Sequence, residues 1–189
     1  MSERRPQRAD AKRNLDALVE AAKAHFAESG VDAPTRTIAK TAGVGVGTLY
    51  RHFPQRSDLV TAVFRHEVDA CADAAPVLAE EFEPEEALVQ WLRRYTDFLG
   101  TKKGIAKALH SGDPAFDALP DYFLERLVPA LTSLLTAAEA SGAIRHGVNA
   151  TELLYAIASL SAPFTPESPT PGTDMAGLLI DGLRYEPQH

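Results

Sequence analysis

Apolar residues in the first third of the chain recur with the three- and four-residue spacing of amphipathic helices. The pattern predicts one helix that ends at Ser29-Gly30, a second that ends at Gly43, a third over about 45–53 and a fourth that begins at 57–58. Glycine is common just after a helix C-terminus, which supports the first two ends. The expected inward faces are Leu15, Leu18, Val19, Ala22 and Phe26; Ile38, Ala39 and Ala42; Leu49 and Phe53; and Leu59, Val60, Val63 and Phe64.

The same spacing continues to the end of the chain, and no segment alternates as a strand would, so the predicted fold class is all-α. Proline followed by acidic residues at Pro84 suits a helix start, and Asn149 with Glu152 resembles a capping box. The expected later segments are a helix over 84–100, one or two short helices in 101–119, a long helix over 120–141, a helix after Asn149, a proline-rich loop over 162–172 and a final helix around 175–183.

Composition narrows the class of protein. Hydrophobic residues make up 45% of the 189-residue chain, which is enough for a packed core. No apolar run approaches the roughly 18 residues of a membrane span, and the charged start lacks the apolar segment of a secretory signal, so we expect no membrane partner. Cys71 is the one cysteine; it excludes an internal disulfide and favours a cytoplasmic location. A redox switch and a small buried apolar side chain are the two alternatives for Cys71, and the second is favoured.

Charge is distributed unevenly along the chain. The net charge is −7, yet residues 1–60 carry ten Lys or Arg against seven acids, while the remaining 129 residues carry nine against nineteen. A basic N-terminal part on an acidic body indicates that the first part is the one that meets a polyanion.

The segment 37–53 explains what this basic part does. Helix, sharp turn at Gly43-Val44 and helix form a helix-turn-helix layout, in which Leu49 and Phe53 face the core. Glycines on the motif's second helix, the one over about 45–53, allow close approach to a duplex. Its hydroxyl and imidazole groups suit phosphate oxygens. The side chains left facing outward are Val46, Gly47, Thr48, Tyr50, Arg51 and His52.

The stretch "TRTIAKTAGVGVGTLYRHFPQRSDLV" resembles the DNA-binding signature of the TetR family of transcriptional regulators, and residues 11–64 follow that pattern. The resemblance implies a homodimer that binds double-stranded DNA and carries a C-terminal helical domain for a small-molecule effector. Residues 80–185 are loosely similar to the SbtR-like subgroup. The expected domains are an N-terminal arm with the helix-turn-helix domain over 1–57, a connecting helix over 58–78, and a ligand-binding and dimerisation domain over 79–189.

Position by position, the resemblance implies that Arg36 contacts a base edge and that Val46 and Gly47 face the bases. Because Val46 and Gly47 offer no side-chain hydrogen bond, we expect readout by Arg36, by contact of Val46 with thymine methyls, and by DNA shape. The expected phosphate contacts are Thr35, Thr48, Tyr50, His52 and Arg56.

The basic N-terminal tail has two open interpretations. It is either an arm along the minor groove, with Arg13 as a DNA contact, or a solvated and disordered start. Its basic residues are Arg4, Arg5, Arg8, Lys12 and Arg13.

The C-terminal part offers candidates for two further surfaces. Aromatic and apolar residues at helical spacing line either a ligand pocket or a plain core, and His110 belongs either to that pocket or to a loop. The candidate pocket residues are Trp91, Tyr95, Phe98, His110, Phe123 and Leu127. The last two helices resemble the family's dimerisation helices, with Leu153, Ile157, Leu160, Leu178, Leu179 and Leu183 as candidate interface residues.

Two alternative functions stay open. One is an α-helical enzyme that uses His110 with Asp113 and either Asp117 or Asp121, although no nucleophile, metal-ligand spacing or phosphate loop supports it. The other is a DNA-binding dimer without an effector. We expect no metal and no cofactor, and we treat a ligand-released repressor as the leading hypothesis. The identity of an effector, the operator and the regulated genes are not encoded in any motif.

Overall fold

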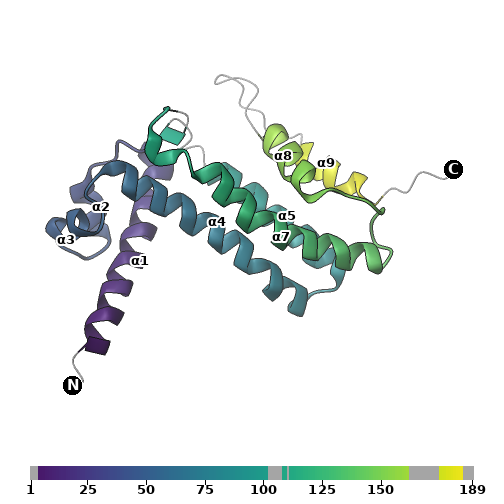
Figure 1. The fold of residues 1–189 in the computed structure, drawn as a ribbon, viewed down its shortest axis with the longest axis horizontal. Helices are drawn as coiled ribbons and strands as arrows, with labels where there is room; N and C mark the ends of the chain where they lie inside the picture. Colours follow the sequence, from purple (N-terminus) through teal and green to yellow (C-terminus); the bar gives the residue numbers. More distant parts are fainter. Residues whose placement is uncertain (1–3, 102–107, 110, 162–174, 185–189) are drawn as a thin grey trace. The chain divides into compact units, whose positions relative to one another are not determined.

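The structure, a computed structural model, describes residues 4–101, 108–109, 111–161 and 175–184 (Figure 1). These residues form helices, turns and loops without a strand, so the all-α prediction is confirmed. His110 and the predicted loop over 162–172 lie outside the described residues. The elements are α1 Arg4–Ser29, α2 Thr35–Thr41, α3 Val46–His52, α4 Arg56–Glu81, α5 Pro84–Thr101, the 3-10 turn η1 Pro114–Phe116, α7 Leu119–Ala140, α8 Ala150–Ser161 and α9 Met175–Gly182.

The chain divides into two compact units. The first contains Met1–Glu67 and Thr101–Pro120, and the second contains Val68–Gly100 and Asp121–His189. Helix α4 begins in the first unit and ends in the second. The domain boundaries expected after residues 57 and 78 therefore both fall inside this one helix.

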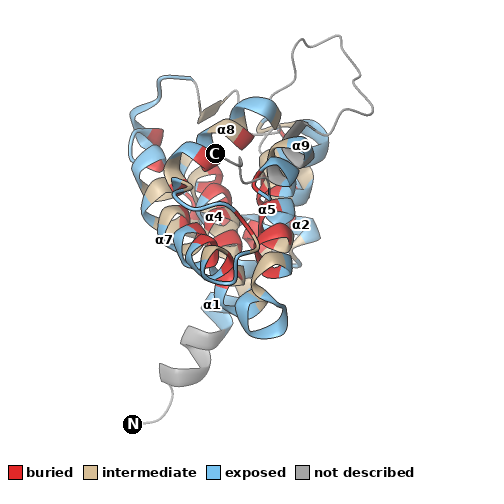
Figure 2. Ribbon diagram, turned by 90° about the vertical axis from the view of Figure 1, so that its right-hand side faces the viewer, coloured by how far each residue is buried: buried red, intermediate tan, exposed pale blue. Residues whose placement is uncertain are grey.

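The first unit is built on the apolar faces expected from the sequence. Phe26 of α1, Ile38 of α2 and Leu49 of α3 are buried, as the periodicity predicts, while Leu15 is half-buried. Figure 2 colours the buried residues of the chain red, most visibly on α4, α5 and α7. At the start of the chain α1 is already helical from Arg4, so the basic residues of the N-terminal tail lie on a helix.

The turn between α2 and α3 is set by one glycine. Gly43 has φ of +71°, a left-handed conformation that glycine adopts without steric conflict. Its N–H donates to the carbonyl of Lys40 at 3.1 Å, and the N–H of Val44 donates to the carbonyl of Ala39 at 3.0 Å. This paired pattern is a Schellman motif, which ends α2 and turns the chain into α3 within three residues.

The second unit packs the rest of α4 with α5, α7 and α8. Its buried side chains include Val68 of α4, Leu88 of α5, Leu131 of α7 and Leu154 of α8. The side chain of Asn149 accepts a hydrogen bond from the N–H of Glu152 at 3.0 Å, which caps α8 as the sequence predicts.

Candidate nucleic-acid interface

Helix α3 presents a bare outer face. Leu49 and Phe53 are buried, at 1% and 6% exposure, whereas Val46 and Tyr50 are 37% and 51% exposed. Gly47 is exposed between them. The spacing of four residues between Leu49 and Phe53 fixes one side of the helix to the core, so the other side is available to a partner.

Nothing in the chain itself requires glycine at position 47. A Cβ added there would meet no other atom within 4 Å, and one added at Gly45 would meet only Thr48 Oγ1 at 4.0 Å. Glycine inside a helix costs about 0.5–1 kcal/mol relative to alanine. The missing side chain therefore weakens the helix without relieving any internal contact, which points to a partner that comes close to this surface.

Two of the predicted phosphate contacts touch each other. Thr35 Oγ1 at the start of α2 and the hydroxyl of Tyr50 on α3 lie 3.0 Å apart. Either oxygen can donate, and each keeps capacity for a further acceptor or donor. The bond ties the two helices of the motif together at their outer surface.

Apart from Arg56, the remaining predicted DNA contacts of the first unit lie on α1, α2 and α3. Arg36 is exposed in the first turn of α2, and Thr48 and His52 are half-buried on α3. The His52 ring stands 6.3 Å from that of Phe53. The guanidinium of Arg13 is bound to Asp10 on α1, so its charge is partly offset within the chain.

Arg56 has a role that the sequence did not reveal. Its guanidinium donates to the carbonyl of Val31, and to that of Ala33 at 2.9 Å. It therefore braces the connection between α1 and α2 from the first turn of α4. A phosphate contact by Arg56 stays a prediction, for which other N–H groups of the guanidinium would be needed.

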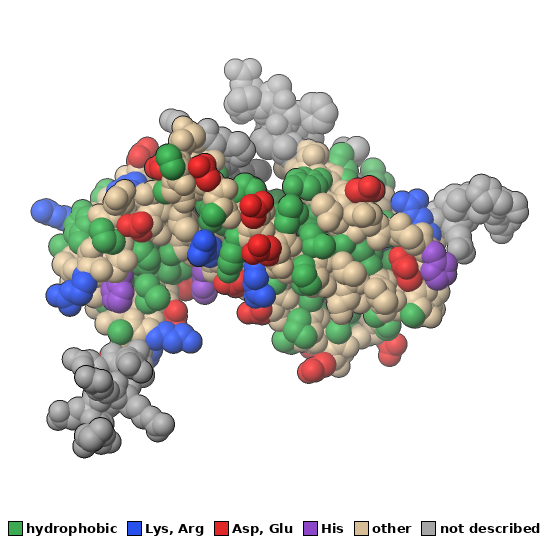
Figure 3. Space-filling model, in the orientation of Figure 1, with side chains coloured by type: hydrophobic (Ala, Val, Ile, Leu, Met, Phe, Trp, Pro, Cys, Tyr) green, Lys and Arg blue, Asp and Glu red, His purple; other side chains and the backbone are tan. Residues whose placement is uncertain are grey.

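Two basic residues that the sequence analysis left out of the site also face outward here. Lys40 in the last turn of α2 and Arg51 in the last turn of α3 are exposed. Figure 3 shows Lys and Arg side chains projecting around α2 and α3. For Arg51 the sequence carried a signal, because Arg51 and His52 are both among the positions of the motif that were expected to face outward.

Polar side-chain pairs join α1 to α4 within the first unit. His66 Nε2 lies 2.7 Å from Glu20 Oε1, and Lys23 Nζ lies 2.7 Å from Glu67 Oε1. Glu20, His66 and Glu67 bring metal-ligand atom types within 4.8 Å of one another. Lys23 already neutralises Glu67, so pairing between the helices accounts for this cluster.

In the second unit, the aromatic residues expected to line a pocket pack against one another. Trp91 and Tyr95 are fully buried and stacked, with ring centroids 5.8 Å apart, and Phe98 and half-buried Phe123 lie 6.3 Å from each other. Leu127 is also fully buried. These residues pack as a buried aromatic cluster, and a ligand contact by any of them stays a prediction.

The polar atoms of this aromatic cluster are satisfied by the backbone. Trp91 Nε1 donates to the carbonyl of Cys71 at 2.8 Å, and the Tyr95 hydroxyl donates to the carbonyl of Leu154 at 3.0 Å. Burial, with a smaller contribution from Cys71, raises the pKa of Tyr95 far above its ordinary value. Tyr95 therefore stays neutral and serves as a fixed hydrogen-bond donor.

A charged network joins α4 to α7 in the same unit. Asp69 Oδ1 accepts from the Tyr122 hydroxyl at 2.7 Å and from Arg126 Nε at 2.6 Å, and Arg126 also reaches Asp73 at 2.7 Å. These hydrogen bonds raise the pKa of Arg126 above its usual value. The network fixes the middle of α4 in place.

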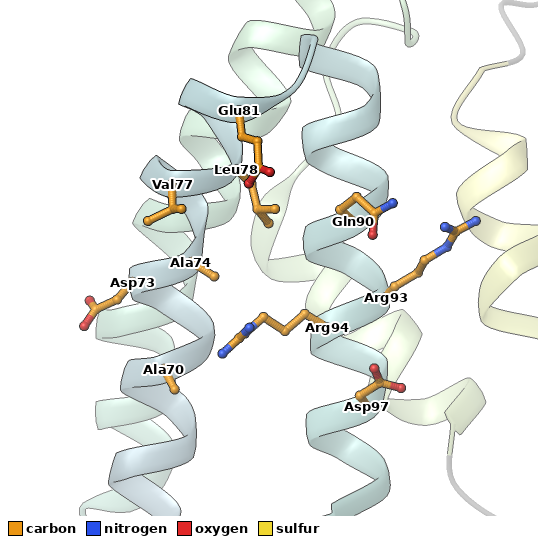
Figure 4. Close-up of a pocket in the computed structure, with 10 residues that line it drawn as sticks. All are labelled: Ala70, Asp73, Ala74, Val77, Leu78, Glu81, Gln90, Arg93, Arg94 and Asp97. Atoms are coloured by element: carbon orange, nitrogen blue, oxygen red, sulfur yellow. The ribbon is translucent and has the colours of Figure 1, made fainter.

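A groove of about 720 Å³ lies along α4 and α5. Figure 4 shows its lining, with Ala70, Ala74, Val77 and Leu78 on α4 and Gln90 and Arg94 on α5. None of these residues belongs to the pocket predicted from the sequence. The sequence contains two adjacent arginines on α5 and several small residues on α4. They lie opposite each other only when the two helices pack together, so the sequence alone did not predict the groove.

The predicted dimer residues separate into two groups. Leu153, Ile157 and Leu183 are buried in the chain's own core, at 5%, 0% and 2% exposure, so they are corrected to core residues. Leu160 and Leu178 are 38% and 61% exposed, and Leu179 is half-buried. Tyr155, which the sequence analysis missed, is 53% exposed on α8. The sequence pattern could not separate the groups, because buried and exposed leucines share the same helical spacing.

The fold and the outward-facing α3 define a helix-turn-helix protein, and comparison with known proteins gives the family. Residues 18–63 match the model of bacterial regulatory proteins of the tetR family, and residues 83–185 match the C-terminal domain of SbtR-like transcriptional regulators. The chain belongs to the TetR family. It is a transcriptional regulator and not an enzyme.

Similar structures agree over nearly the whole chain. The TetR transcriptional regulator SCO0520 from Streptomyces coelicolor is 37% identical, with a TM-score of 0.72 over 90% of this chain and 98% of its own. A TetR regulator from Mycobacterium vanbaalenii is 32% identical, with a TM-score of 0.73 over 95% and 100%.

A curated relative supports the N-terminal part alone. An HTH-type transcriptional regulator of Staphylococcus aureus is 44% identical over 63 residues, which are 33% of this chain and 34% of that protein. The match thus spans about a third of the relative's length. Among the described helices, none combines the length and apolar character needed to cross a membrane.

Proposed function

We propose that this regulator is a repressor that binds a roughly palindromic DNA operator as a homodimer and is released by a small molecule bound in its C-terminal helical part. We also place it in the cytoplasm, where such an operator is accessible. The observation that carries the proposal is the outer face of α3, on which an exposed glycine needed by no internal contact lies beside the joined hydroxyls of Thr35 and Tyr50.

Sequence readout is proposed for Arg36 and Val46. Arg36 is exposed in the first turn of α2, from where a guanidinium can donate two hydrogen bonds to guanine O6 and N7. Val46, 37% exposed at the start of α3, can contact a thymine methyl. With Gly47 adding no side chain, sequence-dependent shape supplies the rest of the specificity.

Backbone contacts are proposed for the polar groups around this surface. Hydroxyl and imidazole groups suit phosphate oxygens, and such contacts fix the register of a protein on DNA without reading its sequence. The residues are Thr35, Thr48, Tyr50, His52, Arg56 and Arg13, to which the exposed Lys40 and Arg51 are added.

Self-association is proposed through α8 and α9. Tyr155, Leu160 and Leu178 are large apolar side chains exposed on these two helices, where a second copy would remove them from water. A two-fold dimer presents two copies of α3, and its symmetry then requires two inverted half-sites in the operator.

Release by a ligand requires two states of the dimer. A ligand in the second unit shifts the equilibrium only if it binds one state more tightly than the other. Helix α4 is one helix from Arg56 to Glu81, so a displacement of its second half reaches the residues that follow α3. The aromatic residues of the second unit pack against one another, which favours a second candidate function, a DNA-binding dimer without an effector.

In vitro selection of bound DNA from random sequence tests the proposal. We expect enrichment of an inverted repeat, and salt-dependent binding to it in mobility shifts. Candidate ligands are then titrated against the complex. Ligands that bind the protein and leave its DNA affinity unchanged would support the effector-free alternative.

A further inference from the structure

We propose that the groove between α4 and α5 binds a small amphipathic carboxylate, a molecule with one carboxylate group and an aliphatic chain. Binding itself does not depend on the proposed function. The regulatory consequence rests on it, because it makes this molecule the effector that releases DNA.

The positive charge of the groove comes from Arg94. Figure 4 shows its side chain extending from α5 toward α4, at the level of the small residues Ala70 and Ala74. Arg126 and Arg184 form salt bridges in this unit, but no salt bridge joins Arg94 to any residue in the described ranges. An anion in the groove would therefore meet a guanidinium with its donors available.

The acidic residues of the groove do not take this place. Asp73 accepts a hydrogen bond from Arg126 at 2.7 Å, and Figure 4 shows Asp73 and Asp97 pointing away from Arg94. Glu81 lies farther along, in the last turn of α4. Arg94 is thus the charged side chain that extends across the groove toward α4, while Asp73 and Asp97 point away from it.

The α4 side of the groove carries an apolar surface. Ala74, Val77 and Leu78 form the α4 side, and Val77 is 59% exposed. A volume of about 720 Å³ lies within the usual range of small-molecule sites. Figure 4 shows Arg93 pointing away from α4, so Arg94 is the arginine that extends toward the aliphatic wall, a combination that matches a carboxylate with an aliphatic chain better than a sugar or a neutral hydrocarbon.

Such a ligand would act on α4 directly. Its carboxylate would be bound by Arg94 of α5 and its chain would rest on α4, so occupancy favours one spacing of the two helices. Because α4 is one helix from Arg56 to Glu81, with Pro76 inside it, a change in its position can alter the separation of the two copies of α3 in a dimer.

Equilibrium dialysis of the full chain against decanoate, below its micellar concentration, tests the site. Decyltrimethylammonium carries the same chain with a positive charge and serves as the matched ligand control. We expect decanoate to bind and the cation not to bind. Arg94→Gln should weaken decanoate binding about ten- to a hundredfold, because a charge-assisted hydrogen bond is lost.

Two further variants test whether decanoate binds in the groove and not elsewhere on the chain. Arg145→Gln removes an exposed arginine of the same unit outside the groove, and it should leave the binding unchanged. Ala74→Phe should fill the groove and abolish binding while the circular dichroism spectrum keeps its helical form. Equal affinity in wild type and Arg94→Gln, or no decanoate binding at all, overturns the proposal.

The regulatory consequence is measured separately. Decanoate should release wild-type protein from its selected DNA, and should release Arg94→Gln only at correspondingly higher concentrations. If the chain binds no DNA, the proposed function is wrong, and equilibrium dialysis still tests whether the groove binds decanoate. If decanoate binds through Arg94 and DNA stays bound, the groove is a ligand site without the regulatory consequence, and that part of the inference is wrong.

Discussion

Thr35 Oγ1 and the Tyr50 hydroxyl lie 3.0 Å apart and connect the first residue of α2 to the outer side of α3. Gly47, three residues before Tyr50 on α3, is exposed as well. The pair can hold the two helices at a fixed separation and still offer hydrogen bonds to a phosphate, so its effect on DNA binding should be cooperative.

A double-mutant cycle tests that cooperation. Tyr50→Phe and Thr35→Val each remove one hydroxyl with little change in shape, and each should weaken DNA binding. Together they should weaken it by less than the sum, with a coupling of about 0.5–1 kcal/mol. Strictly additive losses in DNA affinity, measured by fluorescence anisotropy, would show that the two hydroxyls act independently.

Replacing Arg36 should change specificity more than general affinity. Arg36→Ala is expected to cost about 1–3 kcal/mol on the selected operator and to relax the base preference at one position in each half-site. Lys40→Ala is the matched control, because Lys40 is an exposed cation on the same helix; it should weaken binding to all sequences alike. If Arg36→Ala also weakens all sequences equally, Arg36 contacts only phosphate.

Gly47→Ala should separate folding from function. Since an added Cβ meets nothing within 4 Å, the variant should gain about 0.5–1 kcal/mol in the free energy of unfolding, measured with urea. Its DNA affinity should fall, because the methyl group occupies space that the duplex needs. A stabilised variant with unchanged DNA affinity would refute the close-approach explanation for this glycine.

Charge on the exposed face of α9 should prevent self-association. Leu178→Glu is expected to weaken the dimer by about tenfold or more, because the glutamate would be desolvated in the interface. Val77→Glu is a matched control, since Val77 is 59% and Leu178 is 61% exposed but Val77 lies on α4. Sedimentation equilibrium of the two variants measures how strongly each one dimerises. A dimer that survives Leu178→Glu and dissociates with Val77→Glu would place the interface elsewhere.

The sequence predicted the helices and their inner faces well, because burial imposes a repeating pattern that each helix carries by itself. Phe26, Leu49 and Leu88 all lie where the spacing places them. The turn at Gly43 was also predictable, because it depends on the backbone conformation of a single residue. These features need no knowledge of what lies opposite them.

Features that depend on the neighbouring element escaped the sequence analysis. Apolar spacing alone did not distinguish Ile157, which is buried in the chain, from Leu160, which is exposed on the same helix. The first residues of α1 lack an apolar stripe, so their helical conformation was not predicted. The use of Arg56 on two backbone carbonyls, and the groove beside Arg94, require distant segments to be placed together.

Footprinting of the selected operator tests the central claim most directly, because it reports where and how often α3 meets the duplex. Two copies of the chain should protect two inverted half-sites about one helical turn apart, roughly 34–36 Å, on one side of the DNA. Gly47→Ala should weaken protection of both half-sites equally. One asymmetric protected segment bound by a single copy of the chain would contradict the account.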